Sequence, residues 1–395
     1  MRSGVNSGSA FEKLVSKVIT VDPKLLFLVT EDWYFCSHRL PLAIAAKEAG
    51  FEVMVATRVN EHGDMIRDAG LRLLPLTAFC RRGMNPLREW GAIREIFHLY
   101  RQVQPDIVHQ VALKPVLYGS LAAWPAGCGK VVNALAGLGF VFGSDRMLAR
   151  LLRPLVRQAF RWLLSRPGRR LILQNRDDME QFAREGVVTP EKMVLIRGAG
   201  VDTGCFAPMA EPAGLPLVML ASRLLWDKGV GEFVEAAGLL RRQGVAARFV
   251  LVGDGDPENP ATVPPEQLEA WRQEGDIEWW GRLEDMPAVL GQAHIVCLPS
   301  YREGLPKVLL EAAACAKPIV ATDVPGCREI VRHGENGLLV PPRDGAALGA
   351  AINSLLENAE LRQQMGVAGR RLVEREFAQE IVIEQTLRLY REMLV

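Results

Sequence analysis

The sequence predicts an α/β protein built from two doubly wound parallel sheets, and three observations lead to this prediction. The chain has 395 residues, which is enough for two domains with full hydrophobic cores. Short, nearly continuous apolar runs alternate with helical patterns, as expected for parallel strands that helices cover on both faces. The alternation is interrupted once, by "CFAPMAEPAGLP" (205–216), which is rich in Pro, Gly and Ala and has no periodicity. We therefore expect one sheet before this stretch and one after it.

The first half contains seven strand candidates with helical patterns between them. The candidates are "LLFLVT" (25–30), "EVMVAT" (52–57), "LRLLPL" (71–76), "DIVHQV" (106–111), "KVVNAL" (130–135), "RLILQN" (170–175) and "MVLIR" (193–197). The helical pattern "RLPLAIAAKEAG" closes with Gly50, a residue that favours the end of a helix. The pattern "NPLREWGAIREIFHLYRQV" starts with Asn85 as N-cap and Pro86 at the first helical position.

The second half contains six strand candidates. They are "LVMLAS" (217–222), "ARFVLVG" (247–253), "IEWWG" (277–281), "IVCLPS" (295–300), "PIVATD" (318–323) and "GLLVPP" (337–342). We expect a leader over 1–24, a first domain over 25–205, a linker over 206–216, a second domain over 217–375, and a C-terminal helix over 376–395 that can return to the first domain. Ligands of open parallel sheets collect at the carboxyl ends of the strands, so the loops after 222, 253 and 300 are the candidate binding loops.

Composition narrows the class of protein and its partners. Residues 1–208 contain 28 Lys and Arg against 19 Asp and Glu, whereas residues 209–395 contain 19 against 27. The basic first half is typical of a surface that faces an anionic partner. The seven cysteines are odd in number and include no C-x-x-C pair, which favours reduced thiols in the cytoplasm over disulfides or zinc. No run of 18 apolar residues and no signal-peptide pattern occurs.

Two glutamates in the stretch "SYREGLPKVLLEAAACAKPIVATDVPG" (300–326) carry the strongest indication of chemistry. Glu303 lies in an expected loop beside Gly304, and Pro306 suits the first turn of the helix that follows. The free N–H groups of this helix start favour an anion. Glu311 lies among apolar neighbours, where a carboxylate is costly unless it accepts hydrogen bonds, and ribose hydroxyls are suitable donors. Taken singly, each glutamate is most simply a solvated acid; taken with its surroundings, each favours a nucleotide-sugar site.

The loops after the first two strands of the second half supply the other candidates. Arg223 and Lys228 are the first and last residues of the stretch "RLLWDK", and a diphosphate needs such cations. In "GDGDPENP", Gly253 permits a tight turn, and the D-x-D of Asp254 and Asp256 suits either a divalent metal or a turn. We favour the turn, because Asp and Gly dominate turns for local backbone reasons, and we expect no metal cofactor.

A further strand-end loop follows "PIVATD". It contains Gly326, which we expect close to the ligand.

These motifs resemble a known enzyme family. "REGLPKVLLEAAACAKPIVATDVPGCREIVRHGENGLLV" is similar to the donor-site signature of the family-4 retaining glycosyltransferases, the E-x7-E enzymes, and "SRLLWDKG" and "LVGDGD" match two further family motifs in order. In the first half, "EDWYFCSHRLPLAIAAKEAG", "PDIVHQVALKPVLYGSLAA" and "NALAGLGFVF" resemble the branch that makes bacterial capsule and O-antigen glycans on polyprenyl-diphosphate carriers.

The resemblance implies the GT-B fold, in which two Rossmann-like domains face each other across a cleft. It also implies roles for the residues that match the motifs. It implies that Arg223 and Lys228 bind the donor diphosphate and that Glu303 contacts the donor sugar. It further implies that Gly304 and Leu305 offer backbone N–H groups beside that sugar, and that Glu311 holds the ribose.

The first half departs from the family pattern at two places. Many relatives carry Gly-Gly after the first strand, where this chain reads "TEDWYFCSHR", and many carry a His where Ala136 stands here. The first-domain contact to the reacting sugar is therefore open. The candidates are His38, His109, Lys114 and Asn133, and for each a packing or surface role is an equal alternative.

An arginine stripe in "SDRMLARLLRPLVRQAFRWLLSRPGRR" (144–170) is the second basic feature. Its members share one helical face at spacings of 4, 3, 4 and 4, and they are Arg146, Arg150, Arg153, Arg157 and Arg161. Pro154 is expected to kink or split this helix. The stripe is either a solvated face or, as we favour, a face for anionic lipid at the inner surface of the cytoplasmic membrane.

The sequence thus predicts a metal-independent retaining glycosyltransferase, cytoplasmic and peripheral to the membrane. It would move a sugar from a nucleotide-diphosphate donor, expected to be UDP-linked, to a polyprenyl-diphosphate-linked saccharide, with no nucleic-acid partner. Two alternatives stay open: a GT-B sugar-nucleotide epimerase and a non-catalytic nucleotide-binding scaffold. No G-x-G-x-x-G follows a strand, which argues against dinucleotide binding.

Overall fold

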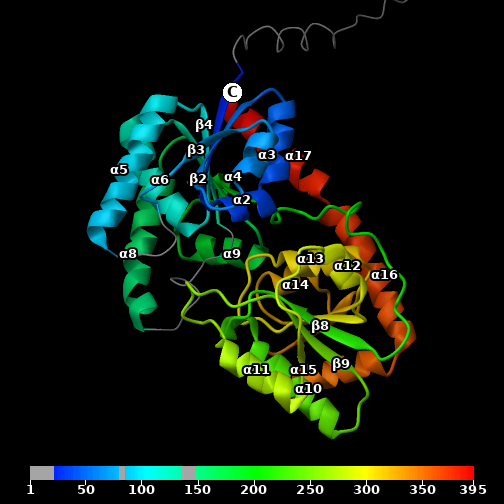
Figure 1. Cartoon of the computed structure of the whole chain (residues 1–395). Helices are drawn as coiled ribbons and strands as arrows, with labels where there is room; N and C mark the ends of the chain where they lie inside the picture. The colour runs from blue at the N-terminus through cyan, green and yellow to red at the C-terminus, as the bar shows by residue number, and fades with distance from the viewer. Residues whose placement is uncertain (1–21, 80–84, 136, 138–146) are drawn as a thin grey trace, which may run out of the picture. The chain divides into compact units, whose positions relative to one another are not determined.

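The computed structural model describes residues 22–79, 85–135, 137 and 147–395, and within 147–152 only the backbone (Figure 1). Its described strands form two sheets. The first has seven strands in the order β3-β2-β1-β4-β5-β6-β7, and the second has six in the order β10-β9-β8-β11-β12-β13. The strand pairings described are parallel, as in β1 with β4 and β8 with β11. The predicted fold class, two doubly wound parallel sheets, is confirmed.

Every strand lies within one residue of a predicted apolar run or inside it. The strands of the first sheet are β1 Lys24–Glu31, β2 Glu52–Arg58, β3 Arg72–Pro75, β4 Ile107–Val111, β5 Lys130–Ala134, β6 Arg169–Leu173 and β7 Met193–Leu195. Those of the second sheet are β8 Leu217–Ala221, β9 Arg248–Val252, β10 Glu278–Trp279, β11 Ile295–Leu298, β12 Ile319–Thr322 and β13 Gly337–Val340. The runs are found from sequence because strands buried on both faces are apolar throughout.

The helices connect these strands. In the first half they are α2 Asp32–His38, α3 Leu40–Glu48, α4 Gly63–Asp68, α5 Pro86–Val103, α6 Leu113–Ala126, α8 Met147–Leu164, α9 Arg176–Arg184 and the short η1 Pro190–Lys192. In the second half they are η2 Trp226–Lys228, α10 Val230–Arg242, α11 Pro265–Glu274, α12 Met286–Gly291, α13 Lys307–Ala314, α14 Cys327–Ile330, α15 Gly345–Leu356, α16 Ala359–Glu376 and α17 Gln379–Leu394. Asn85 caps α5 as predicted, because its side chain accepts a hydrogen bond from the N–H of Leu87 at 3.1 Å.

The chain divides into two compact units. The first contains the residues up to Ala134 with Leu163–Arg170 and Leu387–Val395, and the second contains Leu135–Trp162 and Leu171–Thr386. Residues 171–205 therefore belong to the second unit, although β6 and β7 are strands of the first sheet. The last turns of α17 belong to the first unit.

The first unit has a core in which α5 and α6 cover one face of the sheet. Ile96 and Tyr100 of α5 share a buried cluster with Leu26 and Leu28 of β1 and with Val108 of β4. The C-terminal helix joins this unit through a second buried contact. Tyr390 hydrogen-bonds Nδ1 of His109, and the two rings lie edge to face.

The second sheet has a separate apolar cluster on each face, as alternation along β8 requires. Met219 faces the cluster that contains residues of α13 and α16, whereas Val218 and Leu220 face the cluster that contains residues of α10 and α15. Because both faces are covered, only the edges formed by the strand ends and their loops are open to a ligand.

The helix α8 decides one of the two effects expected of Pro154 in the arginine stripe. It runs from Met147 to Leu164 with Pro154 inside, so the proline does not split it. The proline removes one backbone hydrogen bond, and the burial of Phe160, Leu163 and Leu164 in the last turns stabilises the helix against that loss. Arg146, Ala136 and residues 1–21 of the expected leader lie outside the described residues, as does the side chain of Arg150. Lys24, the last residue of the expected leader, is the first residue of β1. None of the helices described combines the length and the apolar composition needed to cross a bilayer.

Candidate active site

The predicted donor residues lie in loops at the carboxyl edge of the second sheet, around its topological switch point. β8 and β11 are neighbours at the centre of this sheet; the chain proceeds from β8 to β9 and β10 on one side, and from β11 to β12 and β13 on the other. The loops after these central strands leave in opposite directions, which creates a crevice where ligands of such sheets bind. Arg223 and Lys228 follow β8, Asp254 follows β9, and Glu303 follows β11.

Arg223 is held by an acid that the sequence assigned only to a turn. Its Nη1 lies 2.7 Å from Oδ2 of Asp256, a carboxylate whose residue is 8 % exposed. The other oxygen of Asp256 accepts a hydrogen bond from the N–H of Glu258 at 3.1 Å, so the acid also shapes the loop after β9. The Arg223 side chain keeps 44 % of its surface exposed, which leaves the guanidinium able to meet an anion while it is paired.

Lys228 and Glu303 form an ion pair between the loops after β8 and β11. Nζ of Lys228 donates to Oε1 of Glu303, and the hydroxyl of Ser300 donates to the same oxygen at 2.6 Å. Both described contacts use Oε1. The Glu303 carboxylate is thereby fixed in direction, with Oε2 on the side that these two donors do not occupy.

Backbone contacts hold the same two loops together. The N–H of Tyr301 donates to the carbonyl of Asp227 at 2.9 Å. Gly229 takes a left-handed conformation with φ +73°, and a side chain on it would collide with the carbonyl of Pro299. The 3₁₀ turn that ends at Lys228 can therefore approach β11 only because a glycine follows it.

The backbone of Gly304 is packed closely against the loop after β12. Gly326 has φ +81°, and a Cβ built on it would lie 2.6 Å from the carbonyl oxygen of Gly304 and 2.8 Å from that of Glu303. The structure places Gly326 against the loop that carries Glu303 and Gly304. The backbone of Gly326 therefore packs directly on the carbonyl groups of that loop. Cys327 follows it inside the core, where burial raises the pKa of the thiol and the charge of Glu303 adds to the effect.

Gly253 performs a similar task beside β8. It has φ +125°, and a side chain there would collide with the carbonyl of Ser222. The N–H of Leu224 donates to the carbonyl of Asp254 at 2.9 Å, which joins the loops after β8 and β9. The Asp254 side chain is exposed, whereas that of Asp256 turns back to Arg223.

Glu311 is buried in α13, as the sequence suggested, but it already has a partner. The residue is 7 % exposed, and its Oε1 lies 3.2 Å from Nζ of Lys307, one turn earlier on the same helix. α13 begins after Pro306, which is the N-cap and lies just outside the helix, whereas the sequence placed it in the first turn. The N–H groups of the first turn follow Pro306, four residues and more after Glu303.

The four candidates of the first sheet are not equivalent. His109 and Asn133 lie inside β4 and β5, which corrects their predicted place at strand ends; they are 1 % and 0 % exposed. His109 bonds to Tyr390, and burial together with the charge of Arg39 lowers the pKa of its imidazole well below the ordinary value. Asn133 donates to the carbonyl of Arg170 at 3.3 Å and accepts from Ser120. These contacts favour packing roles for both.

Lys114 lies near the end of β4, whereas His38 lies at the end of a helix and not at the strand end where the sequence placed it. His38 is the last residue of α2 and stacks on Tyr34, with 4.3 Å between ring centroids. Lys114 starts α6 and pairs with Glu89 at 2.9 Å. Just before it, Ala112 has φ +79° and ψ 165°, a conformation that only glycine adopts without strain. β1 and β4 are the switch-point pair of the first sheet, so the β4–α6 turn is the first-sheet position that most resembles a binding loop.

Four polar residues of this region went unnoticed in the sequence. They are Asn175, Asp178, Ser300 and Lys307. Lys307 and Ser300 lie close in sequence to their partners Glu311 and Glu303. Asn175 and Asp178 meet Gly304 and Arg302 through the tertiary fold, across 129 and 124 residues. Asp256 was noticed as part of the D-x-D, but its ion pair with Arg223 was not.

Two family models match the chain, and their matches follow the two halves. The model described as "Glycosyl transferase 4-like" matches residues 24–175. The model described as "Glycosyl transferases group 1" matches residues 216–358, which include every candidate donor residue.

Curated relatives align along most of the chain. An N,N'-diacetylbacillosaminyl-diphospho-undecaprenol alpha-1,3-N-acetylgalactosaminyltransferase from Campylobacter jejuni is 29 % identical, over 90 % of this chain and 95 % of its own. A UDP-Gal:alpha-D-GlcNAc-diphosphoundecaprenol alpha-1,3-galactosyltransferase from Escherichia coli is 26 % identical, over 73 % of this chain and 75 % of its own.

A solved structure shares the fold. Sucrose-phosphate synthase from Thermosynechococcus elongatus superposes with a TM-score of 0.77 at 21 % identity, and the match covers 94 % of this chain and 99 % of that one. The matched models and the two parallel sheets agree on one assignment. The chain is a glycosyltransferase of the GT-B type, whose first half matches the 4-like model and whose second half matches the group 1 model.

Proposed function

We propose that this glycosyltransferase is a retaining enzyme that moves a hexose or an N-acetylhexosamine from a UDP-linked donor to a polyprenyl-diphosphate-linked saccharide during surface-polysaccharide synthesis. The observation that carries the proposal is the pair of Lys228 and Glu303 at the switch point, directly before the start of α13. A cation, a fixed carboxylate and a helix start lie in one place, and a nucleotide sugar presents a diphosphate and sugar hydroxyls to such groups.

The reaction breaks the bond between the anomeric carbon and the oxygen of the β-phosphate. Negative charge develops on the leaving UDP, and positive charge develops on the sugar ring as an oxocarbenium ion. Arg223, Lys228 and the N–H groups at the start of α13 stabilise the leaving diphosphate. The acceptor hydroxyl attacks the same face, its proton passes to the departing phosphate oxygen, and the anomeric configuration is retained.

The two glutamates bind different parts of the donor. Oε2 of Glu303 accepts a hydrogen bond from a sugar hydroxyl, because Lys228 and Ser300 hold the carboxylate through Oε1. Glu311 accepts from the ribose hydroxyls. Its ion pair with Lys307 holds the buried carboxylate in place, which supports a role in binding the hydroxyls of a neutral sugar.

No divalent metal takes part in this proposal. Arg223 and Lys228 supply the positive charge that a metal would bring to a diphosphate. Asp256 of the D-x-D pair is engaged with Arg223 and with the N–H of Glu258, which supports its role as an anchor for the arginine.

The acceptor proposal draws on the relatives and on α8. Both curated relatives carry a diphospho-undecaprenol acceptor in their names. On α8, Leu155 is 68 % and Trp162 is 46 % exposed, so apolar side chains accompany Arg153 and Arg157 at the surface. Such a surface suits the anionic inner face of the cytoplasmic membrane. Within the stripe, Arg161 donates to the carbonyls of Glu185 and Gly186 beyond the end of α9.

The proposed function predicts transfer of sugar from a UDP-sugar to polyprenyl-diphosphate-linked saccharides, and this transfer should continue in excess EDTA. A screen of radiolabelled nucleotide sugars with acceptors in anionic or neutral vesicles measures both, and anionic vesicles should give the faster transfer at low salt. A rate that EDTA abolishes and Mn²⁺ restores contradicts metal independence. A new sugar nucleotide formed from donor alone supports the epimerase alternative.

The diphosphate assignment predicts that Arg223→Ala and Lys228→Ala each slow transfer by ~10²–10³, because each removes a cation from the developing charge. Initial rates at saturating acceptor test this, with Arg272→Ala as the matched control. Arg272 is a surface cation of α11 that pairs with Glu269 on its own helix. If both site variants turn over as fast as the control, the assignment is wrong.

The glutamate assignment predicts that Glu311→Gln and Glu303→Gln differ in kind. Glu311→Gln should weaken the binding of UDP itself, since an amide oxygen accepts from ribose hydroxyls less strongly than a carboxylate. Glu303→Gln should slow transfer while it leaves UDP affinity close to that of the wild type. Calorimetry with UDP and transfer rates separate the two, and equal effects on UDP affinity would mean that the roles are misassigned.

A further inference from the structure

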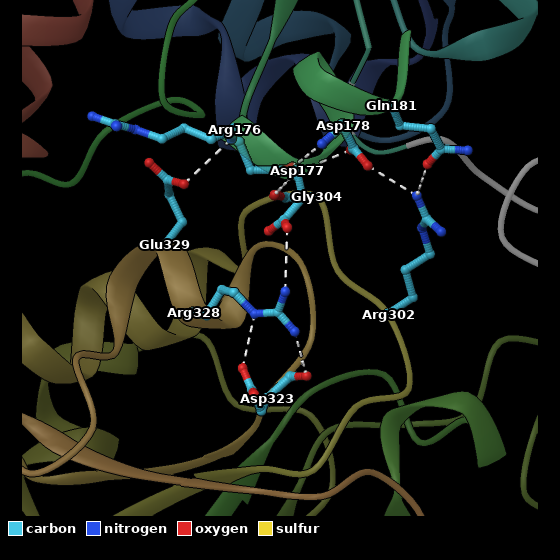
Figure 2. A network of polar contacts seen from close by, with 10 residues as sticks. Arg176, Asp177, Asp178, Gln181, Arg302, Gly304, Asp323, Arg328 and Glu329 are labelled. Atoms are coloured by element: carbon cyan, nitrogen blue, oxygen red, sulfur yellow. Dashed lines mark hydrogen bonds and ion pairs between the residues drawn. The ribbon is translucent and has the colours of Figure 1, made fainter. Parts of the chain in front are cut away.

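The first turn of α9 contacts the loop that carries Glu303. α9 follows β6 of the first sheet, yet it belongs to the same compact unit as the loops of the second sheet. Figure 2 shows Arg302 reaching from the loop to Asp178 and Gln181 of α9, and Gly304 lying beneath the start of that helix. Apart from Gly304, none of these residues had a role in the sequence motifs.

Asn175 uses its whole side-chain amide in this contact. It is fully buried, and as the N-cap of α9 it accepts a hydrogen bond from the N–H of Asp178 at 2.8 Å. Its Nδ2 donates to the carbonyl of Gly304 at 2.7 Å and to Oδ2 of Asp178 at 3.0 Å. Since the oxygen caps the helix, the nitrogen is directed at the Glu303 loop.

This contact fixes the direction of one peptide group in the proposed anion site. The peptide between Gly304 and Leu305 is planar and trans, so its N–H points opposite to its carbonyl. Asn175 holds the Gly304 carbonyl toward α9, and the N–H of Leu305 is therefore directed away from α9. A Cβ on Gly137 would lie 3.3 Å from the Cα of Gly304, and Gly326 lies behind its carbonyl, so the peptide is confined on further sides.

Asp178 restrains the residue on the other side of Glu303. Its Oδ1 lies 2.9 Å from Nη2 of Arg302, and Asp178 is 2 % exposed. Burial raises the pKa of this carboxyl, and the charge of Arg302 opposes that rise. A carboxylate this deeply buried needs its cation, which ties the loop to the helix.

A second loop is tied to the same helix start. Arg328, in the first turn of α14 just after Gly326, lies 3.2 Å from Asp177 and 2.8 Å from Asp323. Glu329 accepts from the N–H of Arg176 at 3.3 Å and from Arg197 at 2.7 Å. Both loops that pack around Gly304 thus form polar contacts with the first turn of α9 (Figure 2).

We propose that Asn175 and the Asp178–Arg302 pair are positioning residues for sugar transfer: they aim the Leu305 N–H and the Glu303 carboxylate at the donor. The inference rests on the proposed function. These residues touch neither the base nor the ribose, and they act through the Gly304 peptide and the backbone of the loop. Their loss should therefore reduce turnover more than it reduces UDP affinity, because a preorganised N–H is most valuable to charge that develops in the transition state.

The test separates positioning from helix capping by a conservative change. Asn175→Ser keeps a cap acceptor for the N–H of Asp178 but removes the amide that donates to Gly304. Asn358→Ser is the matched control, since Asn358 caps α16 by accepting from the N–H of Leu361 at 2.9 Å. We expect kcat of Asn175→Ser to fall by up to ~100-fold, as for a misplaced catalytic group. The melting temperatures of the two variants should be alike, and kcat of the control should equal that of the wild type.

A double-mutant cycle tests the ion pair in the same way. Arg302→Gln leaves Asp178 buried without its cation and should lower kcat, whereas Arg302→Gln with Asp178→Asn should be no worse than the single change, because the two residues act as one unit. Additive losses of kcat contradict the pair's role.

The outcomes distinguish this inference from the function on which it rests. Wild-type transfer with normal kcat in both Asn175→Ser and Arg302→Gln overturns the positioning role and leaves the glycosyltransferase assignment standing. A melting temperature that falls with unchanged kcat shows a structural role only, which also overturns it. A wild-type protein that binds UDP but transfers no sugar to any acceptor overturns the proposed function and, with it, this inference.

Discussion

The ion pair between Lys228 and Glu303 is the contact on which the rest of the site depends. It joins the loops after β8 and β11, the two strands at which the second sheet changes direction. Tight backbone packing makes the pair possible, because Gly229 lets the turn before α10 reach Pro299. Once the pair has formed, the carboxylate, the ammonium group and the start of α13 share one crevice. The fold supplies that crevice, and the residues at its edge supply the chemistry.

Charge balance explains why the cations need partners before a donor arrives. Arg223 pairs with Asp256, and Lys228 pairs with Glu303, so that an empty site holds no unmatched charge from these residues. A diphosphate brings further negative charge to a place where the cations are already aligned. Side chains held in advance lose little freedom when the ligand binds, and they need not reorganise as charge moves to the leaving group. The same reasoning applies to Asn175, whose buried amide holds the Gly304 peptide in a fixed direction.

The sequence was sufficient to predict the fold, and there are physical reasons why several side-chain contacts of the candidate site could not be predicted from it. Buried parallel strands are apolar along their length, so thirteen runs could be identified without a structure. Glu303 and Glu311 stood out because a loop acid beside a helix start and an acid in an apolar helix are both unusual. Asn175 did not, because its partner Gly304, 129 residues away, is set by tertiary packing. Asp256 was noticed, but its pairing with Arg223 is likewise set by tertiary packing. The contact of His109 with Tyr390 spans 281 residues, so the packing role of this histidine could not be predicted from the sequence. The low helix propensity of Pro154 did not end α8, because the burial of the turns that follow it stabilises the helix.

The central claim is that the crevice between β8 and β11 holds the diphosphate of a nucleotide sugar. A crystal structure of the protein with UDP tests it most directly. The account predicts β-phosphate oxygens at hydrogen-bond distance, about 2.7–3.2 Å, from Lys228, Arg223 and the N–H groups at the start of α13. It also predicts ribose hydroxyls on Glu311. A diphosphate bound elsewhere, or bound with Lys228 still directed only at Glu303 and remote from the phosphates, would contradict the account.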